Sequence, residues 1–178
     1  MNNPNLSRIQ RVSGKFRLLL TVLIVLIPIA TLLFWVFFNF TSAGFKSGLP
    51  VKVTTDLPVL KLILGFLISL IPLSATLYGA INLKRLFSLY EKGIVFSEQN
   101  VSCFRHIGYA LVCWVVANFA DTMLISLVLN YEKPYGSRVI AQFGSTDMIF
   151  MMMGAVILLI SWVMKEAVAL EDEHAHTV

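Results

Sequence analysis

Four long apolar runs constrain this chain more than any other feature. They cover residues at about 16–40, 57–83, 107–130 and 148–169. Each is long enough to cross the hydrocarbon core of a bilayer, which needs roughly 20 residues of helix. Charged residues make up only 13% of the chain and hydrophobic residues 57%, whereas a soluble domain carries about 25% charged residues. The sequence therefore predicts an all-α, polytopic membrane protein with four transmembrane helices.

The links between these runs are short, and this limits the architecture. Four helices joined by short links favour a single antiparallel bundle over residues 1–178. The first run is too long for the apolar core of a signal peptide and is expected to remain as the first helix. No segment is long enough for a soluble domain, and no phosphate-binding loop, dinucleotide fingerprint or nucleophile elbow is present. We expect the protein not to be an enzyme.

The basic residues are distributed as in a membrane protein with both termini in the cytoplasm. Nine of the 14 lie before or at the start of the first run, in the connector at 84–106, or near the end of the last run where the C-terminal tail begins, and five lie on the other side. Short cytoplasmic loops are enriched in Lys and Arg. We therefore expect a multi-pass protein of a bacterial inner membrane. The net charge of +4 gathers on no single face, so no direct contact with nucleic acid is predicted.

The connector at 84–106 is the longest charged segment between the two apolar halves. Apolar residues around Leu86 recur with helical spacing and predict one short amphipathic helix. Gly93 then supplies the left-handed residue that ends a helix, and Ser97 offers a side-chain oxygen to cap the next one. The segment is therefore expected to form a helix, a tight turn and a new helix.

Asp121 is the acidic residue that lies well inside an apolar run. Asn118 and Thr122 share its side of the third helix and form a polar stripe. A carboxylate at membrane depth is costly and commonly marks a functional site. The alternative is a structural pin, with Asp121 neutral or paired to Lys61. A proton relay has little support because no second acid or histidine lies well inside a span.

Other side chains of chemical interest have simpler explanations. The aromatic residues at the outer end of the first run resemble an interfacial belt, namely Phe34, Trp35, Phe37, Phe38 and Phe40. The methionines of the last run are better suited to adaptable packing than to copper. Cys103 and Cys113 are about 15 Å apart along one helix and cannot pair within the chain. We expect no cofactor and no metal site.

Several short motifs resemble a bacterial membrane family catalogued as domain of unknown function 2975. They lie in the connector, at the start of the third helix and in the tail, namely Leu86-Phe87, Tyr90, Gly93, Phe96, Asn100, Ile107-Gly108, Leu170-Glu171-Asp172-Glu173 and Thr177-Val178. The family's members are small four-helix proteins, similar in layout to membrane partners of small helix-turn-helix regulators. The resemblance implies a cytoplasmic helix-turn-helix partner and no catalytic residues.

Two functional hypotheses follow. The first is a regulatory or interaction module whose connector and acidic tail form a docking face, with Lys84, Arg85, Tyr90, Glu91, Lys92, Glu171 and Glu173. The same basic residues would equally serve to anchor the connector on anionic lipid of the bilayer. The second is a small transporter or channel that uses Asp121. It predicts a homo-oligomer, because four helices enclose little space.

Overall fold

The computed structural model describes residues 4–40, 56–94, 97–130 and 143–176. These residues form four long α-helices and one short 3₁₀ segment. The elements, in chain order, are α1 (Pro4–Val36), η1 (Phe38–Phe40), α3 (Val59–Glu91), α4 (Glu98–Asn130) and α5 (Ser145–His176). By length and composition, the four long helices are each able to cross a membrane. The described part of the chain is therefore all-helical, and its four long helices indicate a multi-pass membrane protein.

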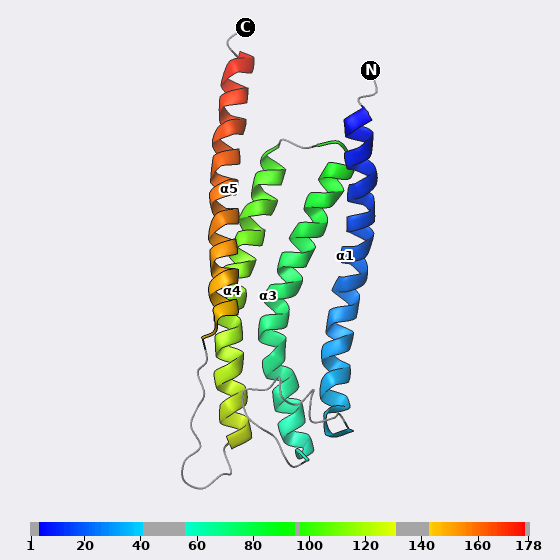
Figure 1. The fold of residues 1–178 in the computed structure, drawn as a ribbon, viewed down its shortest axis with the longest axis vertical. Coiled ribbons are helices and arrows are strands. Elements are labelled where there is room, and N and C mark those ends of the chain that lie inside the picture. The colour runs from blue at the N-terminus through cyan, green and yellow to red at the C-terminus, as the bar shows by residue number, and fades with distance from the viewer. Residues whose placement is uncertain (1–3, 41–55, 95–96, 131–142, 177–178) are drawn as a thin grey trace.

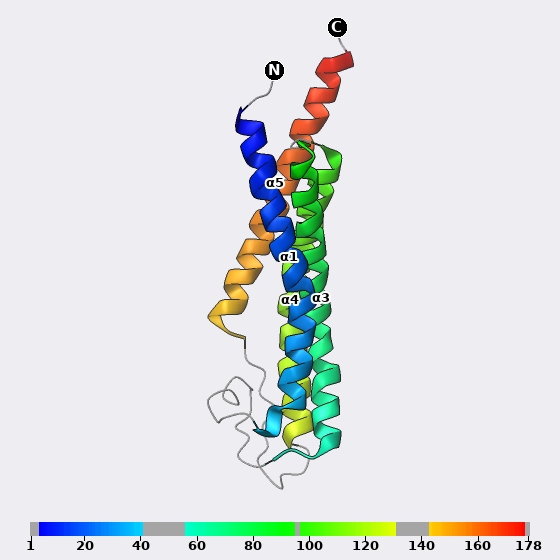
Figure 2. The ribbon, with the colours of Figure 1, turned by 90° about the vertical axis from the view of Figure 1, so that its right-hand side faces the viewer.

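The extensive helix contacts join helices that are consecutive in the chain. α1 packs on α3, α3 on α4, and α4 on α5. Figures 1 and 2 show that both termini lie at the same end of the molecule, and that α5 is shifted toward this end relative to α4. We call this the terminal end; it also holds the link between α3 and α4. α5 therefore projects beyond that link (Figure 1).

The helices extend beyond the apolar runs, and this changes the predicted connector. The amphipathic helix expected around Leu86 is not a separate element but the last part of α3, which continues to Glu91. Likewise, α4 begins at Glu98, well before the apolar run. The prediction followed hydrophobicity, whereas the helical backbone continues through charged residues because helix formation is cooperative.

The turn between α3 and α4 confirms the predicted roles of Gly93 and Ser97. Gly93 has a φ of 79°, a conformation that costs little without a Cβ. Its N–H donates to the carbonyl of Tyr90, and the N–H of Ile94 donates to that of Leu89, the Schellman pattern of helix ends. The N–H of Asn100 donates to the Ser97 hydroxyl at 3.3 Å. Gly93 therefore caps the end of α3, and Ser97 caps the start of α4.

The opposite end of the molecule is fastened by Asn39. Its side chain donates to the carbonyl of Leu57 and accepts from the N–H of the same residue, both at 3.0 Å. Among the neighbouring aromatics, Trp35 is 4% exposed and Phe38 is 0% exposed, whereas Phe40 is 88% exposed. The predicted belt was therefore wrong for Trp35 and Phe38, which belong to the packed interior.

Trp35 of α1 packs directly against α3. Its indole ring lies directly on Gly65, so that a Cβ added there would overlap the ring. The indole Nε1 donates to the Ser69 hydroxyl, one turn further along α3, at 3.2 Å. On the other side, Trp35 packs with Ile125 and Leu129 of α4. This one side chain therefore joins three helices.

α4 and α5 meet through small residues. A Cβ added at Gly108 would come within 3.2 Å of the Gly154 carbonyl oxygen, and one added at Gly154 would meet the Gly108 carbonyl at the same distance. Seven residues from each, the buried Ser161 hydroxyl donates to the Val101 carbonyl at 3.0 Å. Small residues and buried polar contacts are how helices associate in lipid, where burying apolar surface contributes little.

We predict that Gly65→Ala destabilises the protein, because its methyl group needs the space of the Trp35 ring. Overpacking of this kind costs about 1–3 kcal/mol, which thermal unfolding of the purified protein in detergent would detect. Gly14→Ala is the control: its Cβ meets the Glu91 carboxylate at 3.4 Å, an ordinary contact. Equal melting temperatures for the two variants would contradict the packing of the Trp35 ring on Gly65.

Candidate functional site

Asp121 lies at the junction of α1, α3 and α4. The Asp121 carboxyl group lies near the Ser69 hydroxyl of α3, and this hydroxyl accepts a hydrogen bond from the Trp35 indole. Lys61, the partner considered from the sequence, precedes Ser69 on α3 by eight residues. This spacing corresponds to about 12 Å along the helix. The Oδ1 atom of Asp121 is buried and has no hydrogen-bond partner among the described residues. The carboxyl group is thus only partly satisfied.

Asn118 contacts a different helix. Its side-chain amide donates to Oδ1 of Asp147 on α5 at 3.1 Å. The second Asp147 oxygen accepts the N–H of Gly144 at 2.8 Å, which caps the first turn of α5 as acidic residues at this position do. The Thr122 hydroxyl donates to the Asn118 carbonyl within α4. Asn118 therefore holds the start of α5, and its amide group is not directed at Asp121.

The sequence placed Asn118, Asp121 and Thr122 on one side of α4, but their side chains form no common site. Asn118 bonds to Asp147 of α5, Asp121 lies near Ser69 of α3, and Thr122 bonds to its own helix. The partners Ser69 and Asp147 were missed. Asp147 carries a recognisable signal, an acid shortly after a glycine and before an apolar run. Ser69 carries none, because a lone serine is common in membrane helices.

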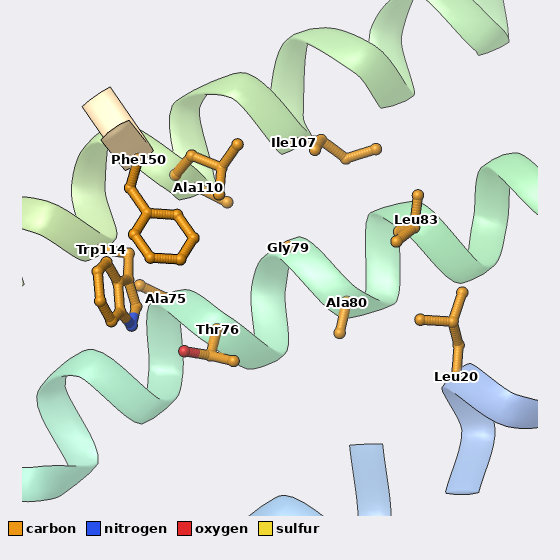
Figure 3. Close-up of a pocket in the computed structure, with 11 residues that line it drawn as sticks. Leu20, Ala75, Thr76, Gly79, Ala80, Leu83, Ile107, Ala110, Trp114 and Phe150 are labelled. Carbon is orange, nitrogen blue, oxygen red and sulfur yellow. The ribbon is translucent and has the colours of Figure 1, made fainter. Parts of the chain in front are cut away.

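An apolar cavity of about 470 Å³ lies between the helices, lined by side chains from all four. In Figure 3, the Trp114 and Phe150 rings lie at one end of it and Leu20 at the other. The two ring centroids are 4.7 Å apart. Thr76, the polar residue in the view, donates its hydroxyl to the Pro72 carbonyl. The cavity therefore suits an apolar chain and offers no arrangement for chemistry on a polar substrate.

The terminal end carries a cluster of charged side chains between α1 and α3. The Arg17 Nε and the Glu91 carboxylate form an ion pair at 3.1 Å. Lys84 and Arg85 line a groove of about 690 Å³ together with Arg17. Two residues of the predicted docking face, Lys84 and Arg85, therefore lie beside α1. A third, Glu91, is paired with Arg17.

The other predicted docking residues have different surroundings. Tyr90 is half-buried and packs on the cluster of Leu86, Leu89 and Cys103. Lys92 is exposed at the end of α3. Glu171 and Glu173 lie in the last turns of α5, and their side chains are outside the described part of the structure.

The metal-binding side chains of the described residues are dispersed. Among residues 9–40, 56–94, 97–130 and 143–170, whose side chains the structure describes, no group of three or more His, Cys, Asp and Glu is arranged to hold a metal ion. Cys103 and Cys113 are both free thiols, as their spacing predicts. Four of the five α5 methionines are exposed, Met152 to 68%, whereas Met164 is half-buried. The prediction that they fill gaps between helices is therefore wrong for the four exposed residues.

A family model described as a protein of unknown function (DUF2975) matches residues 50–178, well over half of the chain. The match begins near the start of α3 and includes α4 and α5, and therefore the contacts of Asp121, Asn118 and Asp147. No curated protein and no solved structure matches the chain.

We predict that Asn118 and Asp147 are energetically coupled. In a double-mutant cycle, Asn118→Ala and Asp147→Ala should together cost less than the sum of their separate effects, with a coupling of about 0.5–1.5 kcal/mol. Unfolding in detergent measures each term. Asn118→Ala combined with Ser161→Ala is the matched control, because these residues do not touch and their effects should add. Strict additivity in the first pair would rule out the α4–α5 hydrogen bond.

Proposed function

The chain belongs to the DUF2975 family of proteins of unknown function, and we propose that it is a membrane-embedded interaction module that docks a cytoplasmic protein. One observation carries the proposal: α5 continues as a helix to His176 and projects beyond the link between α3 and α4 (Figure 1). At the terminal end, its backbone reaches farther than that of the other described helices (Figure 1). A role without catalysis is part of the proposal.

The proposed topology is an antiparallel arrangement in a bacterial inner membrane, with the terminal end in the cytoplasm. Contacts whose residue numbers rise on one helix as they fall on the next support the antiparallel part, as between Val101 and Ser161 and between Asn118 and Asp147. The excess of basic residues at the terminal end supports the orientation, because cytoplasmic segments retain Lys and Arg. In this topology the end of α5 is accessible to cytoplasmic proteins.

The end of α5 has the charge to bind a basic partner. Glu171, Asp172 and Glu173 are consecutive in its last turns, and Ser161 fixes the helix to α4 below them. A small helix-turn-helix regulator has a basic surface for DNA, and an acidic helix complements it. The proposed complex retains such a regulator at the membrane, while the chain itself contacts no nucleic acid.

This geometry concentrates the proposed docking face on α5. Lys84 and Arg85 line the groove beside α1, and Glu91 is paired with Arg17. A partner would have to displace Arg17 to bind Glu91, and it would have to contact the groove beside α1 to bind Lys84 and Arg85. Lys92 remains exposed next to the turn and is available as a secondary contact.

We predict that the acidic end of α5 is required to recover the partner. Crosslinking and affinity purification from native membranes, followed by mass spectrometry, should recover a small helix-turn-helix protein with wild type. The triple change Glu171→Gln, Asp172→Asn and Glu173→Gln should reduce its recovery by at least about tenfold, because electrostatic complementarity is lost.

The control changes charge at the same end on a different helix. Arg11→Gln with Lys15→Gln alters two exposed residues of α1 and should leave recovery of the partner intact. If wild type and the α5 variant recover the same proteins, the docking proposal is wrong.

A second candidate is a subunit of a small transporter or channel, and the buried, unpartnered Oδ1 of Asp121 favours it. Polar groups kept at membrane depth commonly lie on ion or substrate pathways. The extensive contacts join helices that are consecutive in the chain, so α1 and α5 have no extensive contact with each other in the described part of the structure. Further copies of the chain would then complete a pathway in a homo-oligomer.

This candidate predicts that Asp121→Asn abolishes cation flux into liposomes containing the protein, measured with a fluorescent indicator. Asp56→Asn is the control, because it removes an exposed acid before the start of α3 and should preserve flux. Absence of flux with the wild-type protein, reconstituted at several protein densities, would reject the transport candidate.

A further inference from the structure

We propose that the groove between α1 and α3 at the terminal end binds one anionic phospholipid. Its lining comes from two helical stripes that face each other. On α1 these are Gly14, Arg17, Leu18, Thr21 and Ile24, and on α3 they are Ile81, Lys84, Arg85 and Ser88. Both stripes follow the helical period, so the groove runs along the two helices. The inference is independent of the proposed docking function.

The polarity of the groove changes along its length in the order that a phospholipid requires. Arg17, Lys84 and Arg85 lie toward the terminal end, whereas Ile24 and Ile81 lie deeper along the helices. From Gly14 to Ile24 the α1 stripe extends about 15 Å, half the thickness of a hydrocarbon core of about 30 Å. A headgroup would meet the cations while an acyl chain follows the apolar side chains.

The charge of the groove selects an anionic headgroup. Three cations line it, and no acidic side chain is among its described lining residues. The nearby Glu91 carboxylate engages Nε of Arg17, which holds the guanidinium in place while its terminal N–H groups remain as donors. Lys84 and Arg85 have no ion pair with another described side chain. Guanidinium and ammonium groups together suit a phosphate, the guanidinium as a two-point donor.

A second groove at the same end provides a natural comparison. It lies between α4 and α5, measures about 240 Å³, and is lined by Arg105 and Lys165 but also by Glu98. Its smaller volume and its acidic residue make it less suitable for a phospholipid. Removing its two cations lowers the charge of the terminal end by as much as removing Lys84 and Arg85.

The test measures lipid retention by native mass spectrometry of the full chain in detergent. The ligands are phosphatidylglycerol, phosphatidylethanolamine with the same acyl chains, and soluble glycerol 3-phosphate. Wild type should retain phosphatidylglycerol in preference to phosphatidylethanolamine. Lys84→Gln with Arg85→Gln should weaken phosphatidylglycerol binding about 25-fold, at roughly fivefold for each basic side chain. Arg105→Gln with Lys165→Gln should leave it unchanged.

A third variant tests the apolar half without altering any charge. Ile81→Trp narrows the groove at an exposed position and should weaken phosphatidylglycerol binding while the melting temperature in detergent stays at the wild-type value. This variant keeps the test decisive if Lys84→Gln with Arg85→Gln unfolds. Equal losses in the two charge variants, no effect of Ile81→Trp, equal retention of both lipids, or glycerol 3-phosphate binding as strong as the lipid would each overturn the proposal.

Discussion

The packing of the Trp35 ring on Gly65 is the contact on which the rest of the structure depends. In lipid, helices gain little from burying apolar surface against each other, so close packing and buried hydrogen bonds must hold them. The Trp35 ring provides the close packing, and its bond to Ser69 provides the hydrogen bond. The same ring packs on α4. α1 is thereby fixed to the central pair of helices at the end opposite to the termini.

Close packing and hydrogen bonds also hold α4 against α5, but here small residues take the place of the aromatic ring. α4 and α5 approach through Gly108 and Gly154, and two polar contacts flank this crossing. In the predicted polar stripe, Asn118 has a hydrogen-bond partner on α5 and Thr122 has one a turn away on α4. Asp121 is the exception, because one of its oxygens remains buried without a partner among the described residues.

The two ends of the molecule offer different chemistry. The end opposite to the termini is closed by the paired bonds of Asn39 to the backbone of Leu57 and by buried aromatics. The terminal end carries the cationic groove and the projecting acidic end of α5. Lipid binding by the groove and protein binding by α5 use different helices, so both are compatible in one molecule. The apolar cavity lies between these two ends and is suited only to an apolar chain.

The sequence by itself determined the fold class, the four membrane-crossing helices and the turn at Gly93 and Ser97. These features follow from hydrophobicity and backbone conformation, which are local properties. Only the tertiary structure decided that Trp35 is buried, that Asn118 bonds to Asp147, and that Arg17 and Lys84 line one groove. Such contacts depend on the rotation and shift of one helix against another. In a helix that is apolar all round, the sequence does not specify either.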